Sequence, residues 1–204
     1  MGFPEEALAR MKQRYQAQID SDLTTLWEGW GLEGRDTYNH AWSGGPLTIL
    51  SQFAAGVEPD EAGWASFSVL PQMGGLRHIE SRVPTAYGDI DLELLCEDEA
   101  FLLDLLVPAG TTATVGIPLE EVLSRPLLAN GELIWADGEF LGDLDGLTAA
   151  GSDQRWLKFN VDSGQWHFRA IPEPASCVIL GFAALGLPGR RHRNRVRKSS
   201  QRGA

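Results

Sequence analysis

Apolar residues change their spacing along the chain, which predicts helices before residue 56 and strands after residue 63. Near the start, four apolar residues recur at intervals of three or four, the spacing of one face of an α-helix. They are Leu8, Met11, Tyr15 and Ile19. Pro4 suits the first turn of this helix, and the polar residues from Asp20 end it.

A second, shorter helix is predicted to begin near Pro46 and to stop at Gly56. Its inner face would carry Leu47, Leu50 and Phe53 or Ala54. Two helices joined by a long loop cannot form a stable core by themselves, so we expect a helical hairpin that rests on the domain after it.

The later part of the chain alternates between apolar and polar residues, as half-solvated strands do. In residues 87–95, Ile90, Leu92 and Leu94 fall on one side and acids on the other. Other strands are predicted at 64–69, 101–107, 111–117, 133–136, 156–161 and 166–170. Turn residues at 108–110 separate two strands, and those at 162–164 predict a hairpin. Segments 119–130 and 137–152 are predicted to be looser. The fold class is therefore mainly β, an antiparallel β-sandwich.

The charge is unevenly distributed. The net charge is −11, but seven of the 17 Lys and Arg residues lie in residues 190–204, which hold no acid. The remainder thus carries ten basic residues against 28 acids. So acidic a body is a poor partner for nucleic acid, whose phosphates need Lys and Arg. It suits a neutral partner such as a polysaccharide, or simply a soluble surface.

The two cysteines do not predict a metal site, and we expect no cofactor. The only two cysteines, Cys96 and Cys177, are too few and too far apart in sequence for a structural zinc site. We interpret Cys96 as a buried thiol and Cys177 as a thiol of the tail, in preference to a disulfide.

The segment from Thr24 to Gln52 carries the candidate chemistry. It combines three tryptophans with three acids, a Tyr-Asn-His run and a Gly-Gly-Pro break. Aromatic faces can stack on a sugar ring while polar groups bind its hydroxyls. Carboxylates can transfer protons at a glycosidic bond. The candidates are Glu28 for catalysis and Trp27, Trp30, His40 and Trp42 for substrate binding. Core packing or a structural hydrogen bond is the alternative for each, and Glu33 and Asp36 are expected to be solvated.

Two stretches carry a family resemblance that extends over roughly residues 3–170. TTLWEGW followed by TYNHAWSGGPLTILSQ resembles the last part of the helical catalytic domain of bacterial α-L-rhamnosidases. The segment GVEPDEAGWASFSVLPQMGGLRHIESRVPTAYGDIDLEL resembles the β-sandwich that follows it. The resemblance implies that residues 1–56 are the last helices of an incomplete (α/α)6 barrel and residues 57–170 a C-terminal β-sandwich domain.

The resemblance also implies a chemistry, the inverting hydrolysis of terminal α-L-rhamnosides in a rhamnose-containing oligosaccharide, polysaccharide or glycoside. Glu28 would be the general base, with a pKa raised by burial beside tryptophan. His40 would bind a sugar hydroxyl. This region departs from the commoner family pattern, because Ala41-Trp42-Ser43 follows the Asn-His pair where a tyrosine-rich helix is usual.

The general acid of the family lies in earlier helices, which this sequence does not contain. We therefore expect the chain to be the C-terminal fragment of the hydrolase and to be inactive without the N-terminal catalytic segment. No secretory signal opens the chain. The resemblance implies a longer protein that extends ahead of this point, so we expect Met1 to be either a mis-called start or the edge of a fragment, with any signal upstream of it. The alternative is a non-catalytic, surface-anchored module that binds carbohydrate or has a structural role.

Residues 171–204 form a separate tail. Pro172-Glu173-Pro174 is followed by an apolar run at 177–187 and then by arginines. This order resembles the PEP-CTERM sorting signal, which implies a short hydrophobic helix, export machinery as a partner, transient membrane anchoring and a final place at the cell surface or outside it. The apolar run is too short for an ordinary spanning helix. The alternative is a terminal helix with a basic, disordered end.

Overall fold

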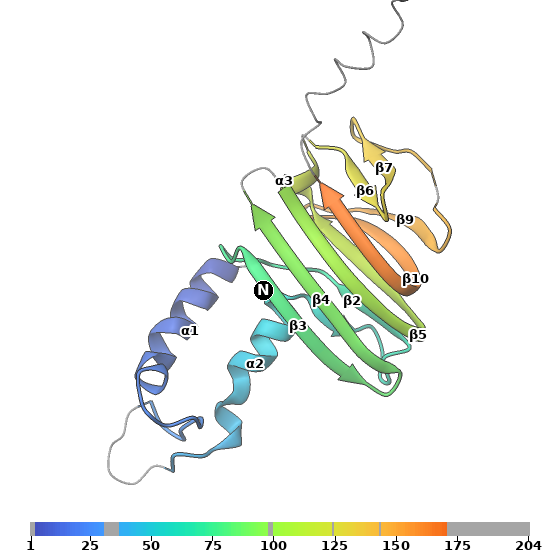
Figure 1. Cartoon of the computed structure of the whole chain (residues 1–204). Coiled ribbons are helices and arrows are strands. Elements are labelled where there is room, and N and C mark those ends of the chain that lie inside the picture. The colour runs from blue at the N-terminus through green and yellow to red at the C-terminus, as the bar shows by residue number, and fades with distance from the viewer. Residues whose placement is uncertain (1–2, 31–36, 98–99, 124, 143, 171–204) are drawn as a thin grey trace, which may run out of the picture. The chain divides into compact units, whose positions relative to one another are not determined.

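The computed structural model describes residues 3–30, 37–97, 100–123, 125–142 and 144–170, which all belong to one compact unit (Figure 1). The helices are α1 (Pro4–Ile19), the 3-10 helix η1 (Ala41–Gly44), α2 (Gly45–Ile49), the π-helix η2 (Leu50–Ala54) and α3 (Leu119–Val122). The strands are β1 (Val57–Pro59), β2 (Ser66–Val69), β3 (His78–Thr85), β4 (Gly88–Glu97), β5 (Ala100–Pro118), β6 (Leu127–Ala129), β7 (Glu132–Ala136), β8 (Glu139–Phe140), β9 (Leu147–Ser152) and β10 (Trp156–Ala170). No helix in these ranges is long and apolar enough to cross a membrane.

Two long strands, β5 and β10, organise the mainly β fold. They pair with each other along nearly their whole length. The first part of β5 also pairs with β4, which pairs with β3, and the end of β10 pairs with β6. The last part of β5 pairs with β2, and the start of β10 pairs with β9. Each long strand therefore contributes to two groups of shorter strands.

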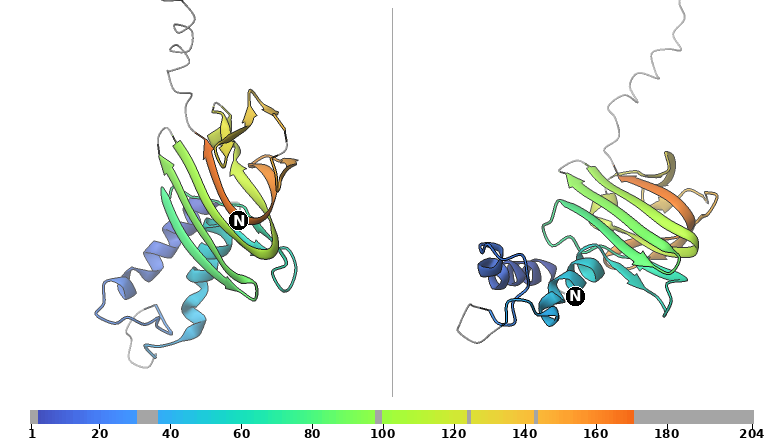
Figure 2. Two further views of the ribbon diagram at one scale, coloured as in Figure 1. Left: turned by 45° about the vertical axis from the view of Figure 1, so that its right-hand side comes forward. Right: turned by 60° about the horizontal axis from the view of Figure 1, so that its bottom comes forward.

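Both long strands bend, and the bend brings their two halves face to face (Figure 2). Phe159 and Phe168 are nine residues apart on β10, which would separate them by about 30 Å in a straight strand. Their ring centroids are 6.0 Å apart instead. The predicted hairpin at 162–164 is therefore wrong. The two halves of β10 both pair with β5, and the register shift between Asp162 and Gly164 marks the bend.

The turn predicted at 108–110 is also a bend within one strand. Pairing with β10 jumps from Val107 opposite Gly164 to Thr112 opposite Asp162. The extra residues on β5 form a bulge, which increases local curvature. Gly110 has a φ of +80°, and the buried Thr111 hydroxyl donates a hydrogen bond of 2.8 Å to the Pro108 carbonyl. The turn chemistry was recognised correctly, but its position inside a continuous strand was not.

The predicted alternation is confirmed along the strands. Ile90, Leu92 and Leu94 of β4 are buried, and so are Phe101, Leu103, Leu105 and Val107 of β5. Complete burial of one such side chain stabilises the fold by about 1.5–3 kcal/mol. One pair, β2 with β5, is parallel, whereas the other strand pairs are antiparallel. Strand β9 lies within the segment 137–152 that was predicted to be a loop.

The helical segment buries different side chains from those that the sequence predicted. Helix α1 is present, and Leu8 is buried against the backbone near Gly74. Ile19, predicted to belong to the apolar face, is 68% exposed. Leu47 of α2 is 74% exposed, while Leu50 and Ala54 pack toward the core as predicted.

Some sequence predictions fall outside the described residues. These are the acids Glu33 and Asp36, the cysteine Cys177 and the whole tail 171–204. Cys96, at the end of β4, is only half-buried, and its thiol donates a hydrogen bond of 3.1 Å to Glu121 Oε1.

Candidate functional site

The predicted base, Glu28, is held in a short hydrogen-bonded arrangement with Thr37. The Glu28 amide donates to the Thr37 carbonyl at 2.9 Å. In return, Glu28 Oε2 accepts the Thr37 amide at 3.1 Å and its hydroxyl at 3.2 Å. Among the described residues, nothing donates to Oε1. Oε2 is therefore anchored, whereas Oε1 has no donor in the described part of the chain.

The expected direction of the Glu28 pKa shift is wrong. The hydrogen bonds from the Thr37 amide and hydroxyl lower the pKa of Glu28, a small burial effect opposes them, and nearby His40 lowers it further. Glu28 is not enclosed by tryptophan, so the desolvation that would raise its pKa is slight. The carboxylate is ionised at neutral pH, which is the form that accepts a proton.

His40 and Trp42 lie together beside this loop. Their ring centroids are 4.4 Å apart with an interplanar angle of 42°. Trp42 is 70% exposed and presents much of its ring to solvent. His40 is half-buried, and its Nδ1 is a buried atom with no hydrogen-bond partner among the described residues. These two side chains could form one wall of a sugar site.

The other two tryptophans lie in different surroundings. Trp27 is 2% exposed and meets Tyr38 edge to face, so its ring presents no open surface. Trp30 is 56% exposed, packs edge to face on Tyr15, and lines an apolar groove of about 370 Å³ between α1 and α2. The structure therefore groups Glu28, His40 and Trp42 but leaves Trp27 inside the segment and Trp30 in a separate groove.

The chemistry that this group can offer rests on one carboxylate. In the described part of residues 24–42, Glu28 is the single carboxylate. A carboxylate with one free oxygen can take a proton from water. Hydrolysis with inversion also needs a carboxylic acid about 6.5–9.5 Å away to protonate the leaving oxygen.

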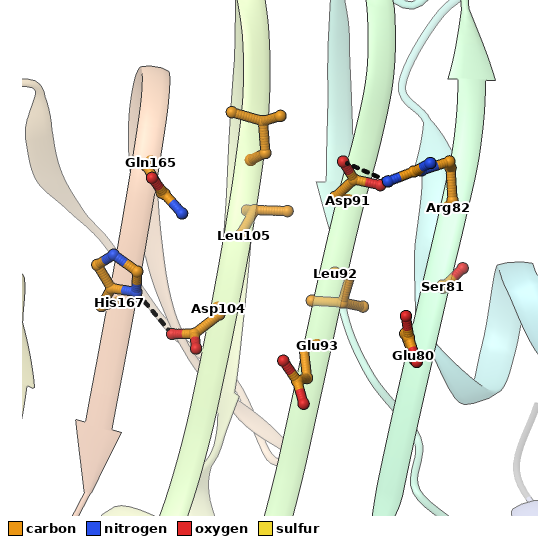
Figure 3. A pocket seen from close by; sticks show the side chains of 11 residues that line it. Glu80, Ser81, Arg82, Asp91, Leu92, Glu93, Asp104, Leu105, Gln165 and His167 are labelled. Carbon is orange, nitrogen blue, oxygen red and sulfur yellow. Dashed lines mark hydrogen bonds and ion pairs between the residues drawn. The ribbon is translucent and has the colours of Figure 1, made fainter.

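A second candidate site, missed in the sequence, lies on the outer face of β3, β4, β5 and β10 (Figure 3). We call it the sheet groove. Its volume is about 640 Å³. Strand register aligns one polar residue from each strand in a single row. The row is Glu80, Glu93, Asp104 and His167. The outward-facing acids of β4 could be recognised from the sequence. Which residues of the other strands lie beside them depends on the strand register, which the sequence does not show.

Ion pairs hold the side chains of the sheet groove in place. Asp104 Oδ1 lies 2.7 Å from His167 Nδ1 and 2.7 Å from Arg169 Nη2. Burial would raise the pKa of Asp104, but hydrogen bonds from His167 and Arg169 outweigh it and lower that pKa. On the other side of the groove, Arg82 Nε pairs with Asp91 Oδ1 at 2.5 Å.

Comparison with known proteins finds that part of the chain is similar to one family of domains. Residues 56–127 match the model of the bacterial alpha-L-rhamnosidase C-terminal domain. A relative, an alpha-L-rhamnosidase of Formosa agariphila, is 24% identical over 162 residues, which are 74% of this chain and 16% of the relative. The chain thus spans about a sixth of that relative's length.

Solved structures show the same fold. The alpha-L-rhamnosidase from Dictyoglumus thermophilum matches with a TM-score of 0.63 and 24% identity, over 76% of this chain and 17% of that one. The Streptomyces avermitilis alpha-L-rhamnosidase complexed with L-rhamnose matches with a TM-score of 0.61 and 21% identity, over 74% of this chain and 14% of that one. The mainly β fold of this chain, and residues 56–127 in particular, match the C-terminal domain of bacterial α-L-rhamnosidases.

Proposed function

We propose that this chain is the C-terminal part of a glycoside hydrolase of the α-L-rhamnosidase type and that it needs further helices to act. The observation that carries the proposal is the family match of residues 56–127. It is supported by the relatives, which are about six times longer than the matched part. Terminal α-L-rhamnosides are the proposed substrate.

The surface of the helical segment supports a missing partner. Eight of the thirteen exposed large hydrophobic side chains in the described residues lie between Phe3 and Leu47. The buried polar atoms without a partner, within the described residues, also lie there. They are Gln18 Nε2, Trp27 Nε1 and His40 Nδ1. Exposed apolar patches and unsatisfied buried donors are both costly, and additional helices would relieve both.

In the completed site, Glu28 would act as the general base of an inverting reaction. Oε2 is fixed by Thr37, so Oε1 is the oxygen that would take a proton from the attacking water. His40 would bind a sugar hydroxyl and Trp42 would cover one face of the ring. The acid that protonates the leaving oxygen would come from the additional helices. Its absence removes a contribution of about 10²–10⁴ in rate, so the chain alone should be inactive.

The test begins with the longest open reading frame that contains this sequence. A frame that encodes further helices should yield a protein that hydrolyses p-nitrophenyl α-L-rhamnoside, while the 204-residue chain alone should not. Glu28→Gln should abolish turnover in the longer protein and leave its thermal unfolding unchanged. Glu132→Gln, an exposed acid on β7, is the matched control and should retain activity. Activity in Glu28→Gln close to that of the unmodified enzyme would remove the assignment of the base.

The alternative is a non-catalytic module that binds carbohydrate, and the sheet groove is the observation that favours it. A frame that begins at Met1, together with sugar binding by the chain, would support this alternative over the hydrolase.

For the tail, we propose the sorting role that its Pro-Glu-Pro order suggests, with export to the cell surface. Deletion of residues 171–204 should change the fractionation of the protein in its native host. Unchanged fractionation would count against the sorting signal.

A further inference from the structure

We propose that Ser43 and Tyr15 are positioning residues for Glu28, on which they act through the main chain without touching its carboxylate. This inference rests on the proposed function, because it concerns the orientation of the proposed general base. The two residues lie on separate elements, Ser43 in η1 and Tyr15 in α1. Tyr15 belongs to the apolar face predicted for α1, and its hydroxyl has a use that the apolar spacing does not show.

The peptide group between Trp27 and Glu28 is held at both of its polar ends. Its carbonyl, that of Trp27, accepts a hydrogen bond from the Ser43 hydroxyl. Its N–H, that of Glu28, donates to the Thr37 carbonyl at 2.9 Å. Because a peptide group is planar, two hydrogen bonds at its opposite ends fix its orientation and restrict the rotation that would redirect the Glu28 side chain.

Helix α1 supports the same segment with two further side chains. The Tyr15 hydroxyl donates a hydrogen bond of 2.8 Å to the Ser43 carbonyl. Three residues later, Gln18 Oε1 accepts the Trp27 amide at 3.2 Å. Residues three apart lie on the same face of a helix. One face of α1 therefore holds both Ser43 and the residue that precedes Glu28.

These contacts are shielded from water. Trp27 is 2% exposed and Gln18 is 6% exposed. Burial also raises the pKa of Tyr15, so its hydroxyl stays protonated and able to donate over the range in which a carboxylate titrates. A shielded hydrogen bond is not readily replaced by one to water, so a variant that lacks either hydroxyl loses a constraint on the main chain.

The position of the main chain decides how the Glu28 carboxylate is held. Its Oε2 accepts the Thr37 amide at 3.1 Å and the Thr37 hydroxyl at 3.2 Å, and these two bonds lower the pKa of Glu28. Rotation of the Glu28 peptide group would lengthen them and reduce that lowering. Among the described residues, His40 is the titratable group whose charge acts on Glu28, and it lowers the pKa in the same direction.

The first experiment follows the Glu28 carboxyl itself by NMR titration of the 13C-labelled 204-residue chain. Ser43→Ala should move the pKa of Glu28 upward, toward the ordinary glutamate value. This variant removes the hydroxyl alone, because it keeps the amide that donates to the His40 carbonyl at 3.3 Å. Tyr15→Phe should give a smaller upward shift. Ser43→Thr, which retains a hydroxyl, should not, and neither should Ser152→Ala, an exposed serine of β9.

The second experiment measures hydrolysis of p-nitrophenyl α-L-rhamnoside by the longer enzyme. Ser43→Ala should lower kcat about tenfold to a hundredfold and change KM by less than about twofold, because the base is displaced while the groups that bind the sugar remain. Ser43→Thr should recover most of that loss. Ser152→Ala, the matched control, should show no loss.

Two results would overturn the inference. One is a Glu28 pKa that is the same in Ser43→Ala, in Tyr15→Phe and in the unmodified chain, even where Tm falls, since the hydroxyls would then only stabilise the fold. The other is an equal loss of kcat in Ser43→Ala and Ser43→Thr. If Ser43→Ala does not fold, Tyr15→Phe, which keeps the ring, decides the question. Failure of the proposed function looks different, because Glu28→Gln would then remain active while the pKa shifts in the shorter chain persist.

Discussion

Replacing Gly56 with alanine tests how tightly the helical segment is joined to the β domain. Gly56 lies between η2 and β1, has a φ of +75°, and accepts the Leu70 amide at 2.9 Å through its carbonyl. An added Cβ would lie 2.5 Å from Pro71 N and closer still to the Leu70 carbonyl group. Both are backbone atoms, so the connection itself would have to shift.

Two effects contribute to the expected loss of stability. A non-glycine residue in the left-handed region costs about 1–2 kcal/mol. The backbone overlap adds about 1–3 kcal/mol, the usual cost of forcing extra volume into a packed site. We expect a total of about 3 kcal/mol, which in a protein of this size lowers Tm by about 10 °C.

Two control variants separate these effects. Gly63 has a φ of +104° and no heavy atom within 4 Å of an added Cβ, so Gly63→Ala should show the backbone strain alone. Gly45 begins α2 with free space around it, so Gly45→Ala should be neutral or slightly stabilising. Urea unfolding followed by tryptophan fluorescence measures all three. A loss in Gly56→Ala no larger than in Gly63→Ala would refute the close approach to Leu70.

Two further predictions concern titrating groups. Hydrogen bonds from Lys158 and from two backbone amides lower the pKa of Asp153 to about 2. The stabilisation that Asp153 provides is therefore fully present above the ordinary carboxyl pKa of about 3.9 and is lost as the pH falls toward the lowered value. In Asp153→Asn, the free energy of unfolding should therefore depend less on pH over that range. Burial, and then the contact with Glu121, raise the pKa of Cys96 to about 11. In a Cys177→Ser background, Cys96 should react slowly with a thiol reagent at neutral pH, and it should react faster when Glu121→Gln is added. Rapid reaction of Cys96 in the folded protein that retains Glu121 would contradict the raised pKa.

Alternation along the chain predicted the core of the β domain but not its connectivity. The apolar residues of β4 and β5 are buried as predicted because a strand has the same period wherever it lies. The motifs at 108–110 and 162–164 look like ordinary turns. They lie on neighbouring strands close to the same bend, and the partner strand continues the ladder on either side. A local sequence motif does not show whether a neighbouring strand continues past it. A turn that ends a strand and a bulge that bends one therefore look the same in the sequence.

The candidate sites show the same limit. From the sequence, Glu28 and His40 were proposed for one candidate site. The direction in which the pKa of Glu28 shifts could not be predicted, because it depends on Thr37, nine residues away, and on how little of the carboxylate is buried. The sheet groove was not predicted because its row combines residues from four strands. A shift of one residue in any of them would turn its polar side chain toward the core.

The helical spacing of apolar residues predicted that Ile19 and Leu47 are buried, and the same spacing can explain why they are exposed. Ile19 and Leu47 have the spacing of buried helix faces, yet they are 68% and 74% exposed. The rule that an apolar stripe faces a core assumes that the covering surface belongs to the same chain. If further helices cover these residues, the stripe is correct and only its partner is missing. Charged substitutions at Ile19 and Leu47 should then leave the stability of the 204-residue chain nearly unchanged but prevent assembly of the active, longer enzyme. Equal loss of stability in both proteins would instead mean that these side chains are packed within the chain itself.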